Sequence, residues 1–249
     1  MSYQDIPAAL SEPLRALKLS GMAATLPERN QEACANQMSF YDFLHLLLQD
    51  EVLLREQKSY ERRYQKAGFK GKKTIEAFDF KFNPSINQSL IRELATCRFV
   101  QEKHPVIITG PCGTGKTHIA QAIAHIAIQK GFDVLCTNTG KLSTTMTEAR
   151  ATNAYQRRLK TIAKIPLLVI DDFGLKPLSV AQDDIIHEII EERYECAATI
   201  ITSNLEPSEW GEAFNNKLLG IATIDRLLHN ATRLKLEGKS YRTGKKQKQ

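Results

Sequence analysis

The eight residues from Gly110 to Thr117, GPCGTGKT, follow the spacing G-x-x-x-x-G-K-[ST]. Glycines at positions 110, 113 and 115 allow the backbone to curl and to point its N–H groups toward an anion. Lys116 supplies a positive charge for the outer phosphates of a nucleotide, and the Thr117 hydroxyl can coordinate Mg²⁺. The spacing therefore predicts a phosphate-binding loop made of Gly110, Pro111, Cys112, Gly113, Thr114, Gly115, Lys116 and Thr117.

Two carboxylates, Asp171 and Asp172, directly follow the apolar run Leu167–Ile170. A buried strand that ends in paired acids delivers them to the edge of a sheet where nucleotides bind. We expect Asp171 to hold Mg²⁺ through water and Asp172 to orient or deprotonate the attacking water. Without the upstream loop, such a pair would more often form a helix cap or a turn.

Two further side chains could reach the same nucleotide. Asn204 follows a β-rich segment and could contact the attacking water or the γ-phosphate, although by itself it would be read as a turn residue. Arg226 lies in a helical stretch and could project into the nucleotide of a neighbouring subunit as an arginine finger. The alternative for Arg226 is an ion pair with Asp225 or Glu212. The predicted catalytic set is thus Lys116, Asp172, Asn204 and Arg226.

Short apolar runs alternate with helical patterns from residue 100 onward. The runs are continuously apolar and rich in β-branched residues, which is typical of strands buried on both faces of a sheet. Their alternation with helices predicts an α/β fold with a parallel sheet between helices. We expect strands at 106–109, 134–136, 167–170, 199–202 and, with a weaker pattern, 233–236, and helices at 116–130, 180–194 and 219–228.

The first 70 residues have the periodicity of helices. Leu10, Leu14 and Leu17 recur at helical spacing, and Ser39 can cap a long helix that runs through Ala67. Residues 68–73, GFKGKK, interrupt this pattern as a linker would. The chain is therefore expected to divide into a small all-helical N-terminal domain, 1–70, that contacts a partner or DNA, a nucleotide-binding domain, 71–242, and a disordered basic tail, 243–249.

Phe78, Phe80 and Phe82 alternate with a period of two after the linker. This spacing predicts an extended strand with three aromatic rings on one side. Anchorage onto the core of the following domain is the favoured role for the rings, because large aromatic side chains are usually buried. Lining an adenine pocket is the alternative.

Basic charge is segregated along a chain whose net charge is +6. Residues 50–73, 141–165 and 239–249 each have a net positive charge, which is the pattern that a polyanion-binding protein requires. Any single block could instead be a solvated helix face, and Glu51–Arg55 has the spacing of an ordinary ion pair within a helix. The three blocks together favour binding to the phosphates of double-stranded DNA, with candidate contacts at Arg55, Lys58, Arg62, Lys66, Arg150, Arg157, Arg158, Lys160 and Lys164.

Several classes of protein are disfavoured by composition. The longest apolar run, Ile165–Ile170, is too short to span a membrane, and the N-terminus lacks the pattern of a signal peptide, so a cytoplasmic location without membrane attachment is expected. The five cysteines are widely spaced and odd in number, which argues against a disulfide scaffold or a zinc site.

The segments GPCGTGKT, LLVIDDFG, ITSN and IDRL together resemble the AAA+ ATPases, and within them the clade of DnaC helicase loaders and IstB insertion-sequence helper proteins. The N-terminal segment LRALKLSGMAATLPE is similar to the helical leader of the IstB side. The resemblance implies a P-loop fold with sheet order 5-1-4-3-2, ATP and Mg²⁺ as ligands, and an oligomer on DNA with ATP sites between subunits. It also implies Asp171 as the metal-water ligand, Asn204 as the polar sensor and Arg226 as the arginine acting in trans.

Two departures from the general AAA+ pattern qualify this resemblance. Asp172 stands where most AAA+ proteins have the longer Glu, which favours slow hydrolysis that acts as a timer. Few residues follow the last expected strand, so the usual C-terminal helical lid is reduced or absent and Arg242 is only a candidate lid arginine.

The expected function is that of an ATP-dependent DNA-binding regulator, an ATPase that oligomerises on DNA and assists a transposase in target selection. A replicative helicase loader is the main alternative, and a small-molecule kinase is a third. A GTPase is disfavoured because Asn216-Lys217 is followed by Leu-Leu and does not complete the N-K-x-D pattern.

Overall fold

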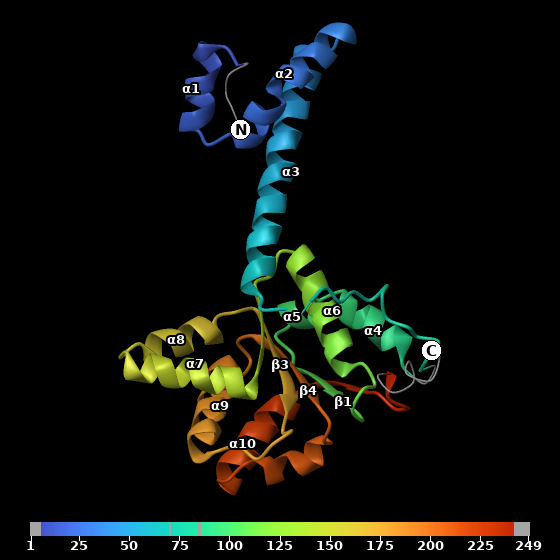
Figure 1. The fold of residues 1–249 in the computed structure, drawn as a ribbon, viewed down its shortest axis with the longest axis vertical. Helices are drawn as coiled ribbons and strands as arrows, with labels where there is room; N and C mark the ends of the chain where they lie inside the picture. Colours follow the sequence, from blue (N-terminus) through green and yellow to red (C-terminus); the bar gives the residue numbers. More distant parts are fainter. Residues whose placement is uncertain (1–5, 70, 84–85, 242–249) are drawn as a thin grey trace, which may run out of the picture. The chain divides into compact units, whose positions relative to one another are not determined.

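The computed structural model describes residues 6–69, 71–83 and 86–241, and the chain divides into two units, Met1–Arg62 and Arg63–Gln249 (Figure 1). Arg242 and the expected basic tail lie outside the described residues. The second unit begins within the long helix, earlier than the boundary that the linker-like segment suggested. The end of the helix belongs there because Arg63 pairs with Asp133 at 3.6 Å and Ala67 accepts a hydrogen bond from the Cys136 N–H at 2.7 Å.

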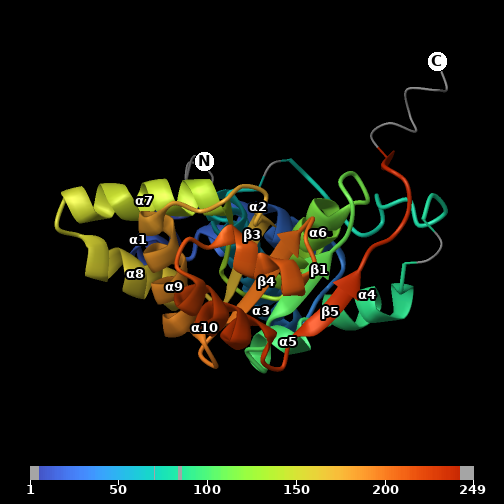
Figure 2. The same ribbon diagram turned by 90° about the horizontal axis from the view of Figure 1, so that it is seen from below.

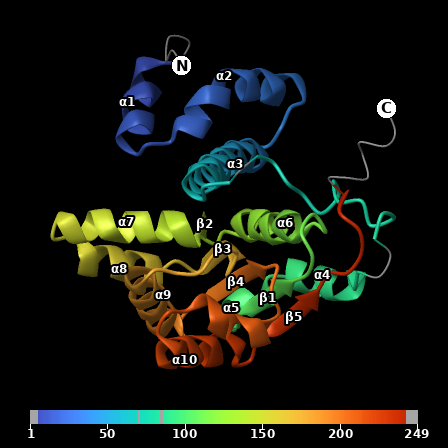
Figure 3. The same cartoon turned by 60° about the horizontal axis from the view of Figure 1, so that its bottom comes forward.

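The second unit contains one five-stranded sheet in which every pair of neighbouring strands is parallel. Its order, β2-β3-β4-β1-β5 (Figures 2 and 3), is the predicted order 5-1-4-3-2 in the opposite direction, and confirms the α/β P-loop fold. Every residue of β1 and β4 is buried, and since successive side chains point to opposite faces, both faces of the sheet are covered. The strands are β1 Val106–Thr109, β2 Val134–Asn138, β3 Leu167–Phe173, β4 Ala198–Ser203 and β5 Thr232–Lys235.

The helices of this unit occupy both sides of the sheet. The helix that follows the phosphate-binding loop, α6 Lys116–Gln129, covers one face, and α9 Val180–Arg193 and α10 Lys217–Leu228 cover the other (Figure 3). Helices α7 and α8 form a hairpin at the β2 side of the sheet, where α7 contacts β2 and β3 (Figure 3). The remaining bounds are α4 Gln88–Ala95, α5 Arg98–Gln101, α7 Thr139–Ala151, α8 Tyr155–Ala163 and the 3₁₀ helix η1 Pro207–Ala213.

The first unit is helical, as predicted. It contains α1 Ala8–Ala16, α2 Ser20–Ala35 and most of α3 Phe40–Lys66. The Ser39 hydroxyl accepts a hydrogen bond from the Asp42 N–H at 3.2 Å, which confirms the predicted N-cap of the long helix.

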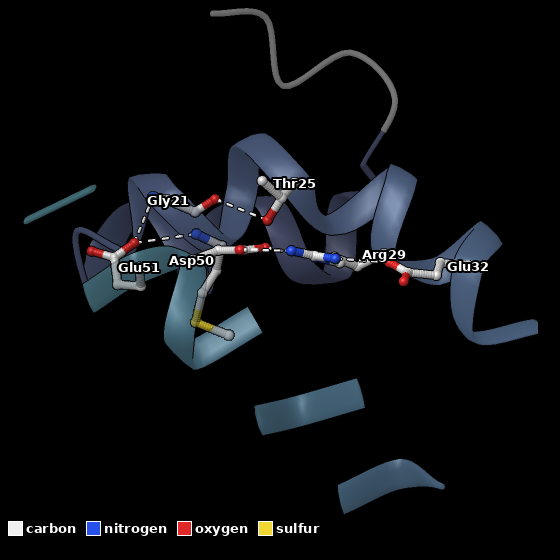
Figure 4. A network of polar contacts seen from close by, with 7 residues as sticks. Gly21, Thr25, Arg29, Glu32, Asp50 and Glu51 are labelled. Atoms are coloured by element: carbon white, nitrogen blue, oxygen red, sulfur yellow. Dashed lines mark hydrogen bonds and ion pairs between the residues drawn. The ribbon is translucent and has the colours of Figure 1, made fainter. Parts of the chain in front are cut away.

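Polar contacts hold α2 against α3 (Figure 4). Arg29 donates two hydrogen bonds to Asp50, at 2.8 and 2.9 Å, and these keep the pKa of Asp50 below its usual value. Burial opposes ionisation of Glu51, but hydrogen bonds from Arg55 and from the Gly21 and Met22 N–H groups outweigh it and lower the pKa of Glu51. The Glu51–Arg55 contact also confirms the ion pair expected from their spacing.

The segment containing Phe78, Phe80 and Phe82 is not a strand, so that prediction is wrong. The chain turns there, and the Asp79 side chain accepts hydrogen bonds from the N–H groups of Lys81 and Phe82 at 3.0 and 3.2 Å. An Asp side chain that bonds to the backbone two residues ahead stabilises a turn, and this local contact replaces the extended conformation suggested by the alternation.

Candidate functional site

The phosphate-binding loop connects β1 to α6, and its three glycines adopt conformations that other residues rarely take. The φ angles are +142° at Gly110, +82° at Gly113 and +103° at Gly115. A Cβ atom on Gly110 would lie 2.0 Å from the carbonyl oxygen of Leu236, a backbone atom that cannot move aside easily. Glycine is therefore needed in the loop for two reasons: the positive φ angles and, at Gly110, the close approach of the Leu236 backbone.

Lys116 begins α6 with its side chain buried under the loop. Its ammonium group donates hydrogen bonds to the carbonyl oxygens of Gly110 and Pro111, at 2.7 and 2.9 Å, and to Asn204 Oδ1 at 2.6 Å. Asn204 comes from the segment after β4, so the fold brings together a lysine and a polar side chain that the sequence separates by 88 residues. Both predicted residues therefore lie at the same site.

Thr117 and Asp171 also meet, at the carboxyl end of β3. The Thr117 hydroxyl donates a hydrogen bond to Asp171 Oδ1 at 2.8 Å, and Asp171 is only 7% exposed. A hydroxyl and a carboxylate form the oxygen donor set that suits Mg²⁺, so these residues fit the predicted ion. Burial, and then the charge of Asp171, raise the pKa of the nearby Cys136 thiol to about 12, which keeps this thiol protonated at neutral pH.

Asp172 lies at an irregularity of the sheet. The register between β3 and β4 shifts between Ile170 and Phe173, and Asp172 has a φ of +56°, in the left-handed region. The irregularity exposes Asp172 at the wall of the cavity beside the loop while Asp171 stays buried. The two neighbouring acids therefore have different environments, as their different predicted roles require.

Thr202 is a site residue that the sequence did not single out. It is fully buried in β4, donates a hydrogen bond to Asp171 Oδ1 at 2.6 Å and accepts one from the Asp172 N–H at 3.0 Å. Only the pairing of β3 with β4 brings it to the acids. The sequence shows polar residues at the end of this strand, and from them we singled out only Asn204.

A cavity of about 470 Å³ adjoins the loop and has an aromatic wall. Phe78 and Phe82 line it together with Tyr241, whose N–H donates to the Gly113 carbonyl at 3.0 Å. The rings of Phe82 and Tyr241 meet edge to face, with centroids 5.0 Å apart. Two of the three phenylalanines thus line the cavity beside the loop, where contact with a base and anchorage, the two roles considered from the sequence, are both open to them.

Arg226 is not at the loop of its own chain. It lies on α10 and lines a different cavity, of about 250 Å³, with Arg193, Tyr194 and His229 among its neighbours. Its guanidinium contacts Glu191 Oε1 at 3.3 Å, so its ion-pair partner is neither of the two acids considered from the sequence. Asp225 and Glu212 were considered because they lie near Arg226 along the chain. Glu191 is distant in sequence and comes close to Arg226 because α9 packs against α10.

All nine candidate DNA contacts are exposed. Four lie on α3, where Arg55 is already paired with Glu51 at 2.6 Å. The other five lie on or just after the α7–α8 hairpin, where the Arg150 guanidinium stacks over the Tyr155 ring at 4.6 Å from its centroid. Tyr155 in turn donates to Glu188 of α9 at 2.5 Å, and burial together with this contact raises the pKa of Tyr155 to about 12.

Comparison with known proteins gives consistent matches along the chain. The model of the family described as IstB-like ATP binding protein matches residues 12–249. A protein of Pseudomonas aeruginosa, named as an ATP-binding protein of insertion sequence IS21, is 34% identical over 235 residues, which cover 94% of this chain and 89% of that protein. An ATP-binding protein of insertion sequence IS232 from Bacillus thuringiensis subsp. berliner is 33% identical over 97% of this chain and 95% of its own length.

Solved structures match the second unit's fold. The DnaC helicase loader superposes with a TM-score of 0.53 and 26% identity, covering 60% of this chain and 89% of that one. DnaI superposes with a TM-score of 0.57 and 21% identity, covering 66% and 91%. Among the described residues, no helix is both long and apolar enough to cross a membrane.

Proposed function

Because the chain belongs to the family of IstB-like ATP-binding proteins, we propose that it is an ATPase that oligomerises on double-stranded DNA and assists a transposase in target selection. The chain is a P-loop ATPase of the AAA+ type from an insertion-sequence family. The observation that carries the finer proposal is the split arrangement of the site: the loop, the acids and Asn204 converge in one chain, while Arg226 lies at a separate cavity.

ATP occupies the loop cavity in this proposal. The N–H groups of the loop and the Lys116 ammonium bind the phosphates, so Lys116 exchanges its contacts with the Gly110 and Pro111 carbonyls for phosphate oxygens. Thr117 and Asp171 would hold Mg²⁺. When bound, this ion neutralises charge that develops on the phosphates. The aromatic wall contacts the base.

Hydrolysis depends on Asp172 and Asn204. Asp172 orients the attacking water and accepts its proton, and Asn204, which contacts Lys116 at 2.6 Å, lies close enough to the phosphate site to orient the same water. The side chain of Asp172 is one methylene shorter than that of the Glu found at this position in most AAA+ proteins. We therefore expect slow turnover, so that the ATP-bound assembly persists before it is released.

Arg226 completes the site of a neighbouring subunit. In its own chain it lies on α10, apart from the loop cavity, which suits a residue that acts in trans. An arginine that reaches an ATP bound by the next subunit makes the oligomer more stable with ATP than with ADP.

The DNA contact is assigned to the exposed basic residues of the α7–α8 hairpin, with the basic face of α3 as a second contact. The first unit is the candidate for the partner contact, because α3 exposes large apolar side chains there, with Phe40 92% and Tyr41 88% exposed. The partner is a transposase, since the relatives are ATP-binding proteins of insertion sequences.

A replicative helicase is the second candidate partner. The DnaC structure supports it, because that helicase loader shares the ATPase core at 26% identity. A pull-down with this protein as bait, against purified transposase and against purified hexameric helicase, distinguishes the two partners. If only the helicase is captured, the helicase-loader function replaces the transposition function.

The experiment for the assembled state measures ATPase activity against protein concentration, with and without duplex DNA, for the native chain and Arg226→Ala. We expect activity per molecule to rise with concentration and with DNA, and to fall in the variant although ATP still binds. Arg92→Ala, at an exposed position of α4, is the control for loss of a positive charge. Activity that is constant per molecule and unaffected by Arg226→Ala would instead identify a monomeric ATPase.

A further inference from the structure

Glu191 of α9 holds the side chain that is proposed to act in trans. Its Oε1 atom accepts from the terminal nitrogen Nη2 of Arg226 at 3.3 Å, while Nη1 of the same guanidinium donates to the Ala222 carbonyl at 3.1 Å. The guanidinium is therefore held at both terminal nitrogens, once by α9 and once by its own helix. A guanidinium carries five N–H groups, and these two contacts use two of them.

The other oxygen of the Glu191 carboxylate lies beside a histidine. Glu191 Oε2 lies 3.3 Å from His187 Nε2, one helical turn earlier on α9. The opposite ring nitrogen, Nδ1, lies 2.9 Å from the hydroxyl of Thr223, a fully buried residue of α10. That hydroxyl donates its only hydrogen to the Leu219 carbonyl at 2.7 Å, so it accepts from His187 Nδ1–H. With Nδ1 protonated in this way, Nε2 donates to Glu191 when the ring carries both protons.

These contacts connect α9 to α10 through a chain of polar groups that ends at Arg226. Thr223 sets the orientation of the His187 ring, His187 contacts one oxygen of Glu191, and the other oxygen contacts Arg226. Glu191 is 53% exposed along its side chain, so its contact with Arg226 has little value as a contribution to stability. We therefore look for the role of these contacts in the position of the Arg226 guanidinium and not in the stability of the fold.

We propose that Glu191 is the positioning residue for Arg226 and holds its guanidinium in the orientation that reaches the phosphates of an ATP bound by the next subunit. The proposal rests on the intersubunit role of Arg226 proposed above. Arginine has many rotamers, and a group confined before assembly loses less conformational entropy when it meets its target. The three N–H groups that the two contacts do not use are the ones that approach the phosphates.

The test measures kcat and KM for ATP in the DNA-stimulated, assembled state. Glu191→Ala is expected to lower kcat by roughly tenfold with little change in KM, because Glu191 is not among the residues that line the ATP cavity of its own chain. Glu191→Gln keeps an acceptor oxygen for Arg226 and is expected to restore most of the activity. The double variant Glu191→Ala with Arg226→Ala should be no slower than Arg226→Ala alone.

Glu192→Ala is the matched control, since it removes another exposed carboxylate from the next position of α9 and is expected to behave like the native chain. Unchanged turnover in Glu191→Ala would overturn the proposal. Faster turnover would overturn it too, because it would mean that Glu191 restrains Arg226. Additive losses in the double variant would overturn it as well. If Arg226→Ala itself has native activity, the arginine-finger function fails, whereas an impaired Arg226→Ala beside a native-like Glu191→Ala refutes the positioning role alone.

Discussion

At the scale of single residues, one hydroxyl links the two acids of the site to the neighbouring strand. Thr202 donates to the buried Asp171 and accepts from the backbone of Asp172. It therefore controls both the orientation of the proposed metal ligand and the position of the proposed catalytic acid. Valine has the same shape without the hydroxyl.

Thr202→Val is expected to raise the Mg²⁺ concentration needed for half-maximal ATPase activity several-fold. The loss of the Thr202 hydrogen bond to the buried Asp171 carboxylate should also lower the free energy of unfolding by about 1–3 kcal/mol. Titration of activity with Mg²⁺ and a thermal melt measure the two effects. Thr202→Ser, which keeps the hydroxyl, is the control, and an unchanged Mg²⁺ requirement in Thr202→Val would remove Thr202 from the site.

The aromatic wall makes a prediction about nucleotide affinity. Stacking of a base on an aromatic ring contributes about 1–3 kcal/mol, so Phe82→Ala is expected to weaken ATP binding by roughly 5- to 150-fold. Binding of inorganic triphosphate, which has no base, should not change. Calorimetric titration with both ligands tests this, and an equal loss for both would mean that the variant damages the loop instead.

At the scale of elements, a single buried arginine ties the basic hairpin to the sheet. Arg193 on α9 is 2% exposed, and it donates to the carbonyl oxygens of Ile162, Ala163 and Ile165 at the end of α8. It also contacts the first residue of β4, Ala198, and donates to Thr199 at 3.0 Å. Burial lowers the pKa of Arg193 to about 9, which leaves the guanidinium protonated at neutral pH.

Arg193→Leu fills a similar volume but removes this donor from the carbonyl oxygens, of which that of Ile162 keeps a hydrogen bond from the Ile165 N–H at 3.3 Å. Since each unsatisfied buried group costs about 1–3 kcal/mol, a loss of on the order of 3 kcal/mol or more in the free energy of unfolding is expected. Chemical denaturation measures it. Arg226→Ala, whose contacts are partly exposed, should cost far less, and a native-like Arg193→Leu would show that these contacts are dispensable.

The packing of α2 against α3 has a predicted pH dependence. Because Arg29 lowers the pKa of Asp50 in the folded state, the ion pair stabilises the first unit above the ordinary pKa of 3.8, and this contribution is lost as the pH falls through the lower, folded value. Hydrogen exchange in α2, corrected for intrinsic rates, should therefore accelerate below about pH 4. Asp50→Asn should reduce that dependence, and the remaining part is expected from Glu51, whose pKa is also lowered by contacts with α2. Asp50→Asn with Glu51→Gln should remove it, and an acid response of Asp50→Asn identical to that of the native chain would exclude Asp50 as a source.

At the scale of the whole molecule, the proposed function requires binding of a polyanion by a chain whose net charge is only +6. Five of the basic residues belong to or directly follow the α7–α8 hairpin, which lies to one side of the sheet (Figure 2). The four on α3 belong to a helix that passes from one unit into the other. Either group can track DNA phosphates, and salt dependence distinguishes them.

Replacing Arg157 and Arg158 with Gln is expected to reduce the slope of log K against log salt by about 0.9 for each phosphate that is no longer bound, hence by up to about 2. The decrease in affinity should be similar for unrelated duplexes, because phosphate contacts carry no sequence information. Lys58→Gln with Arg62→Gln is the matched comparison on α3. A slope that changes only in this second pair would move the main DNA contact to the long helix.

The sequence by itself determined the phosphate-binding loop, the acid pair, the five strands and the capped long helix. These features depend on neighbours along the chain: glycines permit a local conformation, a continuous apolar run requires a buried strand, and Ser39 bonds to a residue three positions ahead. The resemblance to AAA+ ATPases, which depends on these segments, also predicted the order of the strands in the sheet.

Only the tertiary structure decided which distant side chains share a site. Thr202 reaches Asp171 because β4 pairs with β3 in one register, and Arg226 meets Glu191 because α10 packs on α9. Tyr241 joins Phe82 across more than half the chain, while a side-chain contact from Asp79 turns the segment that alternation predicted to be extended. Such contacts are set by the packing of whole elements, and their energies leave no local pattern in the sequence.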